Sequence, residues 1–140
     1  MKRTALKAFA LLGISLAVGA AAAGAQDTIR INIPFDFTVG ESNLPAGVYE
    51  VQRIFGDGVA LRIRCEDCKS EASFMTIGVY AKKEVAPRMV FHRYGSRYFL
   101  NQLWMGGSSS GRQLLKVRLE TELALRETSK QEVVLAAQLR

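Results

Sequence analysis

Cys65 and Cys68 form the motif whose residue types and spacing best suit covalent chemistry. A C-x-x-C pair can close a small disulfide, exchange electrons as a dithiol, or supply two ligands to a metal. A redox role requires a stabilised thiolate, and the two central residues, Glu66 and Asp67, disfavour one because they are acidic. We predict a disulfide that stabilises the fold slightly, since closing so short a loop removes little entropy from the unfolded chain. A redox-active pair, and a metal site or free thiols, stay open as alternatives.

Residues that bind metals are scarce in this chain. A structural zinc site needs four ligands, and the sequence offers two cysteines, one histidine at His92, and scattered carboxylates. We therefore predict neither a metal nor a cofactor. His92 has no second histidine as a partner, and we expect it on a strand surface beside Phe99.

Ser109 lies in a second pattern with chemical meaning, because Gly107–Gly111 matches the G-x-S-x-G of a nucleophile elbow. Hydrolases with this elbow need a largely parallel α/β sheet and a triad in the chain order Ser, acid, His. The single histidine, His92, precedes the serines, and the chain is short for that fold. We predict a flexible linker here and no catalytic residue, with a Ser109 hydrolase as a third and weaker hypothesis.

A basic and aromatic cluster is the candidate binding surface. Arg93, Tyr94, Arg97 and Tyr98 surround one predicted hairpin turn. Together they could hold a sugar or a phosphate by hydrogen bonding and stacking. The simpler interpretation, which we favour, is that Arg93 lies over the Tyr98 ring as a local cation–π pair.

The first 25 residues predict export. Three basic residues stand among the first seven, Ala8–Val18 is apolar, and Ala23–Ala25 has the small-x-small pattern that signal peptidases cut. The mature chain would start at Gln26. The apolar run is too short for a permanent anchor. We predict a periplasmic or secreted protein that does not span a membrane after this cleavage.

Removal of the signal peptide changes the charge of the chain. It takes away three of the 19 basic residues and none of the 13 acidic ones, so the net charge falls from +6 to +3. The remaining 115 residues, 140 less 25, suit one domain with a modest core. So small an excess of positive charge on an exported chain argues against nucleic acid as a partner. Another envelope component, or an anionic glycan or lipid surface, is the expected kind of partner.

Four strands are predicted before residue 81. From Ile29 to Val39 apolar and polar residues alternate with a period of two. Pro34 should break this run or confine it to a sheet edge, which is where we place it. Leu44–Gly47 suits a tight turn, and Lys82–Glu84 reads as a charged loop. The remaining strands, of which the first two form a hairpin, are Val48–Phe55, Val59–Cys65 and Ser73–Tyr80.

Met89–Met105 predicts a hairpin around Gly95–Ser96, a pair that fits a type II′ turn. The turn sets the register, with Phe91 opposite Leu100. The predicted core face carries Met89, Phe91, Leu100 and Trp104. The opposite face, expected to be partly solvated, carries Val90, His92, Tyr94, Arg97, Phe99 and Asn101.

Two signals conflict after residues 106–111, which we interpret as a flexible Gly/Ser link. Apolar and charged residues alternate as in a strand, but the residue types favour helix and Glu122 and Arg126 form a well-oriented i,i+4 pair. We predict a helix at about 113–127, with a strand as the open alternative, and a closing strand within Glu132–Gln138.

The predicted fold is a single mainly β domain at 26–140. We expect a small antiparallel β-sandwich or a partly open barrel of about seven strands, with one C-terminal helix packed on it.

Three separate segments share their pattern with a known family. They are Ile33–Phe37 with Val39–Gly40, Leu44–Gly47 with Tyr49, and Phe91–Gly95 with Tyr98–Leu100 and Trp104. These segments resemble a family of small exported bacterial proteins of unknown function. The resemblance implies an exported, β-rich domain with a charged segment from Gly111 onward, and it brings no catalytic residue, ligand or partner. The C-x-x-C is not part of this pattern.

These observations predict an exported protein that is not an enzyme. We expect an envelope interaction or the binding of a small ligand, the latter in an apolar cavity behind Phe91 and Trp104. The alternative is a thiol–disulfide redox protein that works through Cys65 and Cys68.

Overall fold

The computed structural model describes residues 28–126 and 129–139. The predicted signal peptide, residues 1–25, and its cleavage point at Gln26 lie outside the described residues and stay predictions. The described chain is mainly β, with one helix near the C-terminus, as the sequence predicted. None of its helical structure has the length and apolar character needed to cross a membrane.

Eleven strands and one helix make up the described residues, where about seven strands were predicted. The helix α1 is Arg118–Arg126. The strands are β1 (Ile29–Ile33), β2 (Phe37–Val39), β3 (Ser42–Leu44), β4 (Gly47–Arg53), β5 (Ala60–Cys65), β6 (Glu71–Val85), β7 (Arg88–Tyr94), β8 (Arg97–Trp104), β9 (Ser108–Leu114), β10 (Lys130–Ala136) and β11 (Gln138–Leu139).

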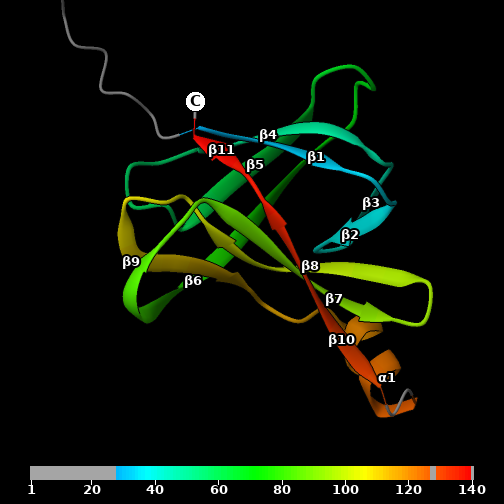
Figure 1. Ribbon diagram of the computed structural model, residues 1–140. Coiled ribbons are helices and arrows are strands. Elements are labelled where there is room, and N and C mark those ends of the chain that lie inside the picture. The colour runs from blue at the N-terminus through cyan, green and yellow to red at the C-terminus, as the bar shows by residue number, and fades with distance from the viewer. Residues whose placement is uncertain (1–27, 127–128, 140) are drawn as a thin grey trace, which may run out of the picture.

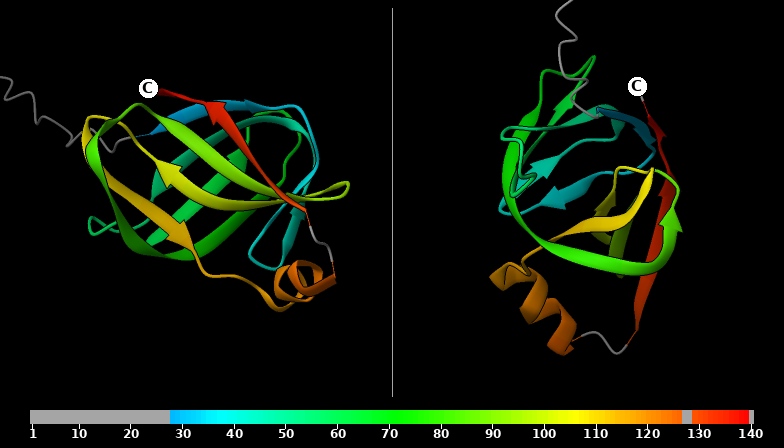
Figure 2. Two further views of the ribbon diagram at one scale, coloured as in Figure 1. Left: turned by 60° about the horizontal axis from the view of Figure 1, so that its bottom comes forward. Right: turned by 90° about the vertical axis from the view of Figure 1, so that its left-hand side faces the viewer.

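One mixed sheet contains these strands, and it is not closed into a barrel. Hydrogen-bonded neighbours follow the order β10-β7-β8-β9-β6-β5-β4-β1-β11, while β2 pairs antiparallel with β3 and parallel with β8. The last two strands pair at opposite ends of this order, β10 with β7 and β11 with β1. Figure 1 shows β10 running across the sheet, and Figure 2 shows the sheet curling around its core with α1 on the outside.

The strand β1 shows how the alternating sequence builds the core. Ile29, Ile31 and Ile33 are buried, and the residues between them are exposed. The chain leaves β1 before Pro34 and enters β2 at Phe37, so the predicted break is confirmed. The predicted edge position is wrong, because β1 pairs with β4 on one side and with β11 on the other. Pro34 does not require an edge strand here, since it follows the last residue of β1 that pairs with β4.

The β7–β8 hairpin has the register that its turn predicts. Phe91 lies opposite Leu100, and Tyr94 lies opposite Arg97. Gly95 has a φ of 62°, which suits the first central position of a type II′ turn. The turn chemistry alone was therefore sufficient to place these residues.

A β-bulge farther along this hairpin overturns the predicted position of Trp104. The register shifts after Val90, which pairs with Gln102, and Met89 consequently lies opposite Leu103. One extra residue in β8 puts Trp104 on the face away from Phe91. Its ring packs so closely over Gly111 that a Cβ at that glycine would lie 2.6 Å from it.

The second face of this hairpin is buried, where partial solvation was predicted. Val90, Tyr94 and Phe99 are each 2% exposed, and His92 is 6% exposed. Arg97, at the tip, is exposed. The alternation of residue types does not reveal that other elements cover this face as well as the core face.

The segments after Tyr80 differ most from their predictions. Lys82–Glu84 belongs to β6 and is not a loop. Residues 108–111 of the predicted flexible link belong to β9, which pairs with both β6 and β8. The predicted helix at 113–127 is shorter, because 113 and 114 end β9 and α1 begins at Arg118. The closing strand is confirmed as β10, with β11 following it.

Candidate functional site

A surface groove lies between the β2–β3 hairpin, the tip of the β7–β8 hairpin and the start of α1, which meet on the right of Figure 1. Its volume is about 380 Å³, within the range of roughly 300–1,000 Å³ typical of small-molecule sites. The residues that line it are Asp36, Phe37, Thr38, Asn43, Leu44, Pro45, Ser96, Arg97, Tyr98 and Leu119. We refer to this feature as the groove.

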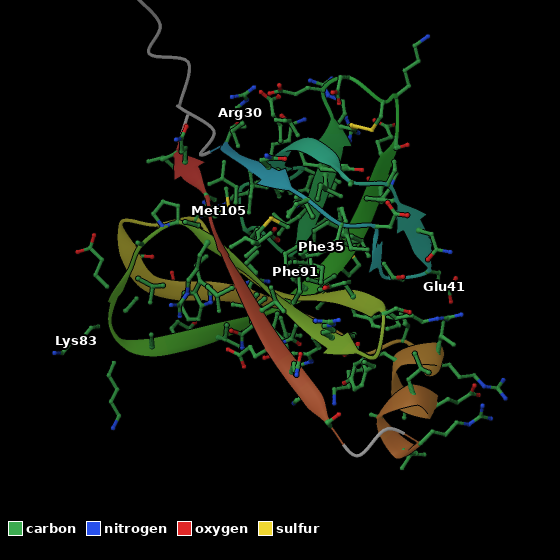
Figure 3. All side chains as sticks on the ribbon, turned by 45° about the vertical axis from the view of Figure 1, so that its right-hand side comes forward. Arg30, Phe35, Glu41, Lys83, Phe91 and Met105 are labelled. Carbon is green, nitrogen blue, oxygen red and sulfur yellow. A yellow bond between two sulfur atoms is a disulfide. The ribbon has the colours of Figure 1, made fainter. Side chains whose placement is uncertain are left out.

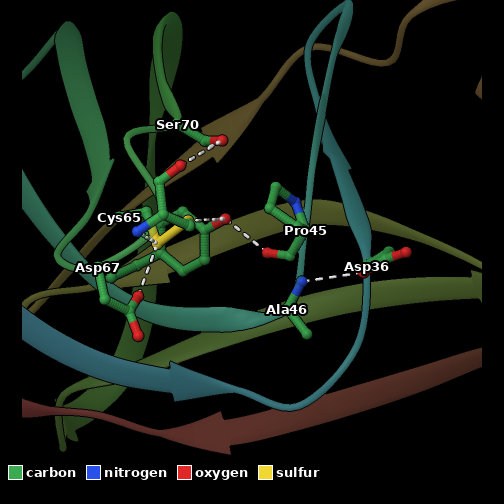
Figure 4. Close-up of a disulfide and its surroundings, with 8 residues drawn as sticks. Asp36, Pro45, Ala46, Cys65, Asp67 and Ser70 are labelled. Carbon is green, nitrogen blue, oxygen red and sulfur yellow. Dashed lines mark hydrogen bonds between the residues drawn. A yellow bond between two sulfur atoms is a disulfide. The ribbon is translucent and has the colours of Figure 1, made fainter.

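Short-range hydrogen bonds shape the β2–β3 side of the groove. Asp36 Oδ1 accepts a hydrogen bond from the Ala46 N–H at 2.9 Å (Figure 4). Thr38 Oγ1 donates to Asn43 Oδ1 at 2.8 Å across the hairpin. Gly40, with a φ of 58°, supplies the left-handed residue between these strands. Three polar side chains are thereby held in place along one side of the groove.

The groove joins segments that are far apart in the sequence. Asp36–Thr38, Leu44–Pro45 and Ser96–Tyr98 all contribute to it. They come from, or directly adjoin, the segments that carry the family resemblance. The parallel pairing of Thr38 with Phe99 brings the first and third of them together.

The structure separates the four predicted binding residues. Arg97 and Tyr98 line the groove. Arg93 points back to its own turn, where its Nε donates to the Gly95 carbonyl at 2.7 Å. Tyr94 is 2% exposed and therefore does not lie on the surface. Two of the four residues are thus available to a ligand in the groove.

Packing fixes the ring of Tyr98. It stacks on Phe35 with 3.8 Å between ring centroids, and the Arg93 guanidinium carbon lies 5.4 Å from its centroid. The predicted cation–π pair is confirmed. Phe35 also meets Phe91 edge to face at 5.1 Å, near the centre of the fold (Figure 3). Because the ring is committed to packing, Tyr98 offers a ligand its hydroxyl and ring edge rather than a stacking face.

A buried polar cluster attaches α1 to β7. Glu120 is 4% exposed and is the one buried residue of α1. Its Oε1 lies 3.2 Å from His92 Nδ1 and accepts a hydrogen bond from the Tyr94 hydroxyl at 3.3 Å. Burial and, next, the Glu120 charge raise the pKa of Tyr94. The predicted surface position of His92 is wrong, because α1 covers this part of the strand.

Sequence reasoning missed Glu120. Its partners His92 and Tyr94 stand two apart on one strand, which places them on the same face. Two polar rings on a face that becomes buried need a polar partner. That requirement was a usable signal, but it does not single out a carboxylate 28 residues farther along.

Cys65 and Cys68 form a disulfide at the end of β5 (Figure 4), as predicted. Cys65 is 4% exposed, and its Sγ accepts a hydrogen bond from the Cys68 N–H at 3.2 Å. Backbone bonds hold the loop to its surroundings, from the Cys65 N–H to the Ser70 carbonyl at 2.8 Å and from the Glu66 N–H to the Val48 carbonyl at 2.9 Å. The disulfide therefore belongs to a loop that is already braced by the backbone.

The surroundings of the disulfide do not favour a reactive thiolate. The Asp67 carboxylate lies 3.1 Å from Cys65 Sγ, and a negative charge there opposes a thiolate. These two cysteines and Asp67 have their ligand atoms within 4.8 Å of one another, but the sulfurs are bonded to each other and a structural zinc site needs four ligands. The redox role of Cys65 and Cys68 stays a prediction.

Ser109 lies inside β9, where its side chain is exposed. Its neighbours Ser108 and Ser110 interact with each other, with 3.0 Å between their Oγ atoms. A nucleophile elbow needs a sharp turn from strand to helix at the serine, and here the strand continues to Leu114. The G-x-S-x-G match therefore lacks the geometry of an elbow.

The predicted ligand cavity behind Phe91 and Trp104 does not correspond to the packing of these residues. They lie on opposite faces of the hairpin, as the bulge requires. Phe91 packs edge to face against Phe35 and Phe37, with centroids 5.1 and 5.6 Å away. Trp104 packs over Gly111 and lies 5.7 Å from the Arg88 guanidinium carbon.

The fold and the groove define a mainly β protein with a polar surface site. Comparisons with protein families, curated proteins and solved structures found no match. The resemblance to a family of small exported bacterial proteins stays a prediction that rests on the three sequence segments.

Proposed function

We propose that this protein is an exported, non-enzymatic binding module whose groove holds a segment of an acidic envelope glycan. The observation that carries the proposal is the convergence of six polar side chains from distant segments on one depression of about 380 Å³. They are Asp36, Thr38, Asn43, Ser96, Arg97 and Tyr98.

The chemistry of the groove suits a ligand rich in hydroxyl groups. Hydroxyl, amide and carboxylate groups can each exchange hydrogen bonds with sugar hydroxyls. Pro45 and Leu119 add apolar surface for the C–H groups of a sugar ring. Arg97 is exposed at the rim, and a guanidinium pairs with a carboxylate through two parallel hydrogen bonds. An acidic sugar therefore fits better than a neutral one.

The location of the ligand follows from the predicted export. The signal peptide at residues 1–25 directs the chain to the periplasm or the exterior. A disulfide in the loop at Cys65–Cys68 supports an oxidising compartment. The predicted mature charge of +3 favours an anionic partner.

Calorimetric titration tests the proposal with trigalacturonate and, as the neutral counterpart, galactotriose. We expect the acidic sugar to bind more tightly. Arg97→Ala should weaken its binding by about 10- to 100-fold, the loss typical of a charged hydrogen-bonding partner, and should leave the neutral sugar unaffected. Arg62→Ala, which removes an exposed arginine of β5 outside the groove, is the matched control. Equal binding of both sugars, or unchanged binding by Arg97→Ala, would refute the proposal.

The redox alternative has its own test. The disulfide exists, and Cys68 is partly exposed. If the protein catalyses insulin reduction and Cys65→Ser abolishes the activity, a thiol–disulfide function replaces the binding function as the better account. Absence of activity in the wild-type protein removes this alternative.

A further inference from the structure

We infer that Glu120 is a positioning residue for the groove: its carboxylate holds α1 on β7 so that Leu119 closes one wall, and loss of the charge opens that wall. The inference rests on the proposed function, since it describes how the ligand site is completed.

The attachment of α1 depends on a polar group. Glu120 is its one buried residue, whereas Leu119 and Leu125 are 41% and 84% exposed. An isolated helix of nine residues is marginal in water, and this helix buries no complete apolar stripe that could compensate. The hydrogen bonds that join Glu120 to His92 and Tyr94 are therefore its principal anchor.

The anchor and the groove are adjacent along the chain. Leu119 directly precedes Glu120 and lines the groove together with Arg97 and Tyr98. Tyr94 and Arg97, which flank the hairpin turn, are a cross-strand pair, so the anchor and the groove rim also share one hairpin. Displacement of α1 from β7 would carry Leu119 away from the ligand.

The charge on Glu120 decides the strength of this anchor. The Tyr94 hydroxyl donates to Glu120 Oε1, His92 Nδ1 lies 3.2 Å from the same oxygen, and hydrogen bonds to a carboxylate are roughly twice as strong as neutral ones. The other charged groups around the cluster are at the surface. In the sheet, Lys130 and Glu132 of β10 lie opposite Tyr94 and His92, and Arg97 of β8 lies opposite Tyr94. On α1, Arg118 forms an ion pair with Glu122.

The test compares Glu120→Gln with Glu122→Gln in the full chain. Both changes remove one negative charge from α1, but Glu122 pairs with Arg118 on the exposed side. Hydrogen exchange of residues 118–126 should become about tenfold faster in Glu120→Gln, as expected for a charged hydrogen bond replaced by a neutral one, and should stay unchanged in Glu122→Gln.

Trigalacturonate affinity provides the second readout. We expect Glu120→Gln to weaken it several-fold. Tyr94→Phe, which removes one of the two donors, should have a smaller effect of the same kind and serves in place of Glu120→Gln if that variant does not fold.

The outcomes separate this inference from the proposed function. Unchanged helix exchange in Glu120→Gln overturns the inference even where the wild-type protein binds trigalacturonate. Faster helix exchange with unchanged affinity also overturns it, because α1 would then not complete the groove. No saccharide binding by the wild-type protein, together with faster exchange in Glu120→Gln, refutes the proposed function and supports the anchor alone.

Discussion

The disulfide loop and the α1 anchor are held in opposite ways. The disulfide joins residues three apart, and its loop is bonded to the neighbouring strands by backbone groups. The anchor joins Glu120 to His92 and Tyr94, which are 28 and 26 residues away, through side chains alone. The motif with the clearest chemistry in the sequence is thus a local brace. The groove depends on contacts between segments that no short motif displays.

The largest expected effect comes from Phe91→Ala, which removes a core ring next to the groove region. Phe91 is fully buried against Phe35, the residue on which Tyr98 stacks. Removing a buried phenylalanine ring costs about 3–5 kcal/mol, so the free energy of unfolding measured in urea should fall by that amount. Phe55→Ala is the control, because Phe55 is 65% exposed. Equal losses in the two variants would show that Phe91 contributes no more to stability than an exposed ring does.

The double variant Cys65→Ser/Cys68→Ser should have a smaller effect. Chain entropy assigns about 2 kcal/mol at most to a bridge of this length, and the backbone bonds of the loop remain. Urea unfolding should show this loss, and trigalacturonate affinity should be unchanged because neither cysteine lines the groove. A loss as large as that of Phe91→Ala would mean that the disulfide organises more than its own loop.

Local signals in the sequence predicted local structure well. The Gly95–Ser96 turn gave the hairpin register, Pro34 gave a strand break, and the C-x-x-C gave a disulfide. Each of these depends on a few neighbouring residues. The errors share a different cause: the bulge at β8 and the pairing of β9 arise from contacts with other strands, so alternation within one segment could not reveal them.

The candidate site was predicted only in part for the same reason. Arg97 and Tyr98 were identified from residue type beside a turn. Asp36 and Leu119 enter the groove through the placement of β2 and α1, which is a property of the whole fold. Glu120 was harder still to predict from the sequence, because a charged residue in a polar helix ordinarily faces water.

The two regions can be compared at alkaline pH, because the disulfide region contains Tyr49 and the α1 anchor contains Tyr94. Burial is the main cause that raises the pKa of both, followed by Glu120 for Tyr94 and by Asp36 and Asp67 for Tyr49. The unfolded tyrosines ionise near pH 10 while the folded ones stay protonated, so stability present below that pH is lost as the pH rises beyond it. Urea unfolding between pH 8 and 11 should show this loss.

Tyr94→Phe and Tyr49→Phe should each make that alkaline loss shallower. The Tyr94 hydroxyl donates to a carboxylate, whereas the Tyr49 hydroxyl donates to the Pro45 carbonyl. If Tyr94→Phe leaves the alkaline profile unchanged while Tyr49→Phe alters it, burial beside Glu120 does not raise the pKa of Tyr94.

The smallest expected effect concerns two exposed ion pairs, one taken from each region. Arg30 binds Glu66, inside the disulfide loop, through two hydrogen bonds of 2.8 and 2.9 Å, and these bonds lower the pKa of Glu66. The resulting stability is present above the ordinary glutamate pKa and is lost as the pH falls through the lower folded value. Arg30→Gln should reduce this loss of stability at acid pH when the salt concentration is low, and should make no difference to it when the salt concentration is high.

Arg118→Gln, which breaks the exposed pair with Glu122 on α1, should also change the free energy of unfolding only slightly. The two regions would then be alike in their surface charges. The difference between them would lie in the burial of Glu120, because a carboxylate removed from water depends on its partners far more than an exposed one does. A large effect of Arg30→Gln that persists in high salt would contradict this, and would make the charged rim of the disulfide loop a structural element in its own right.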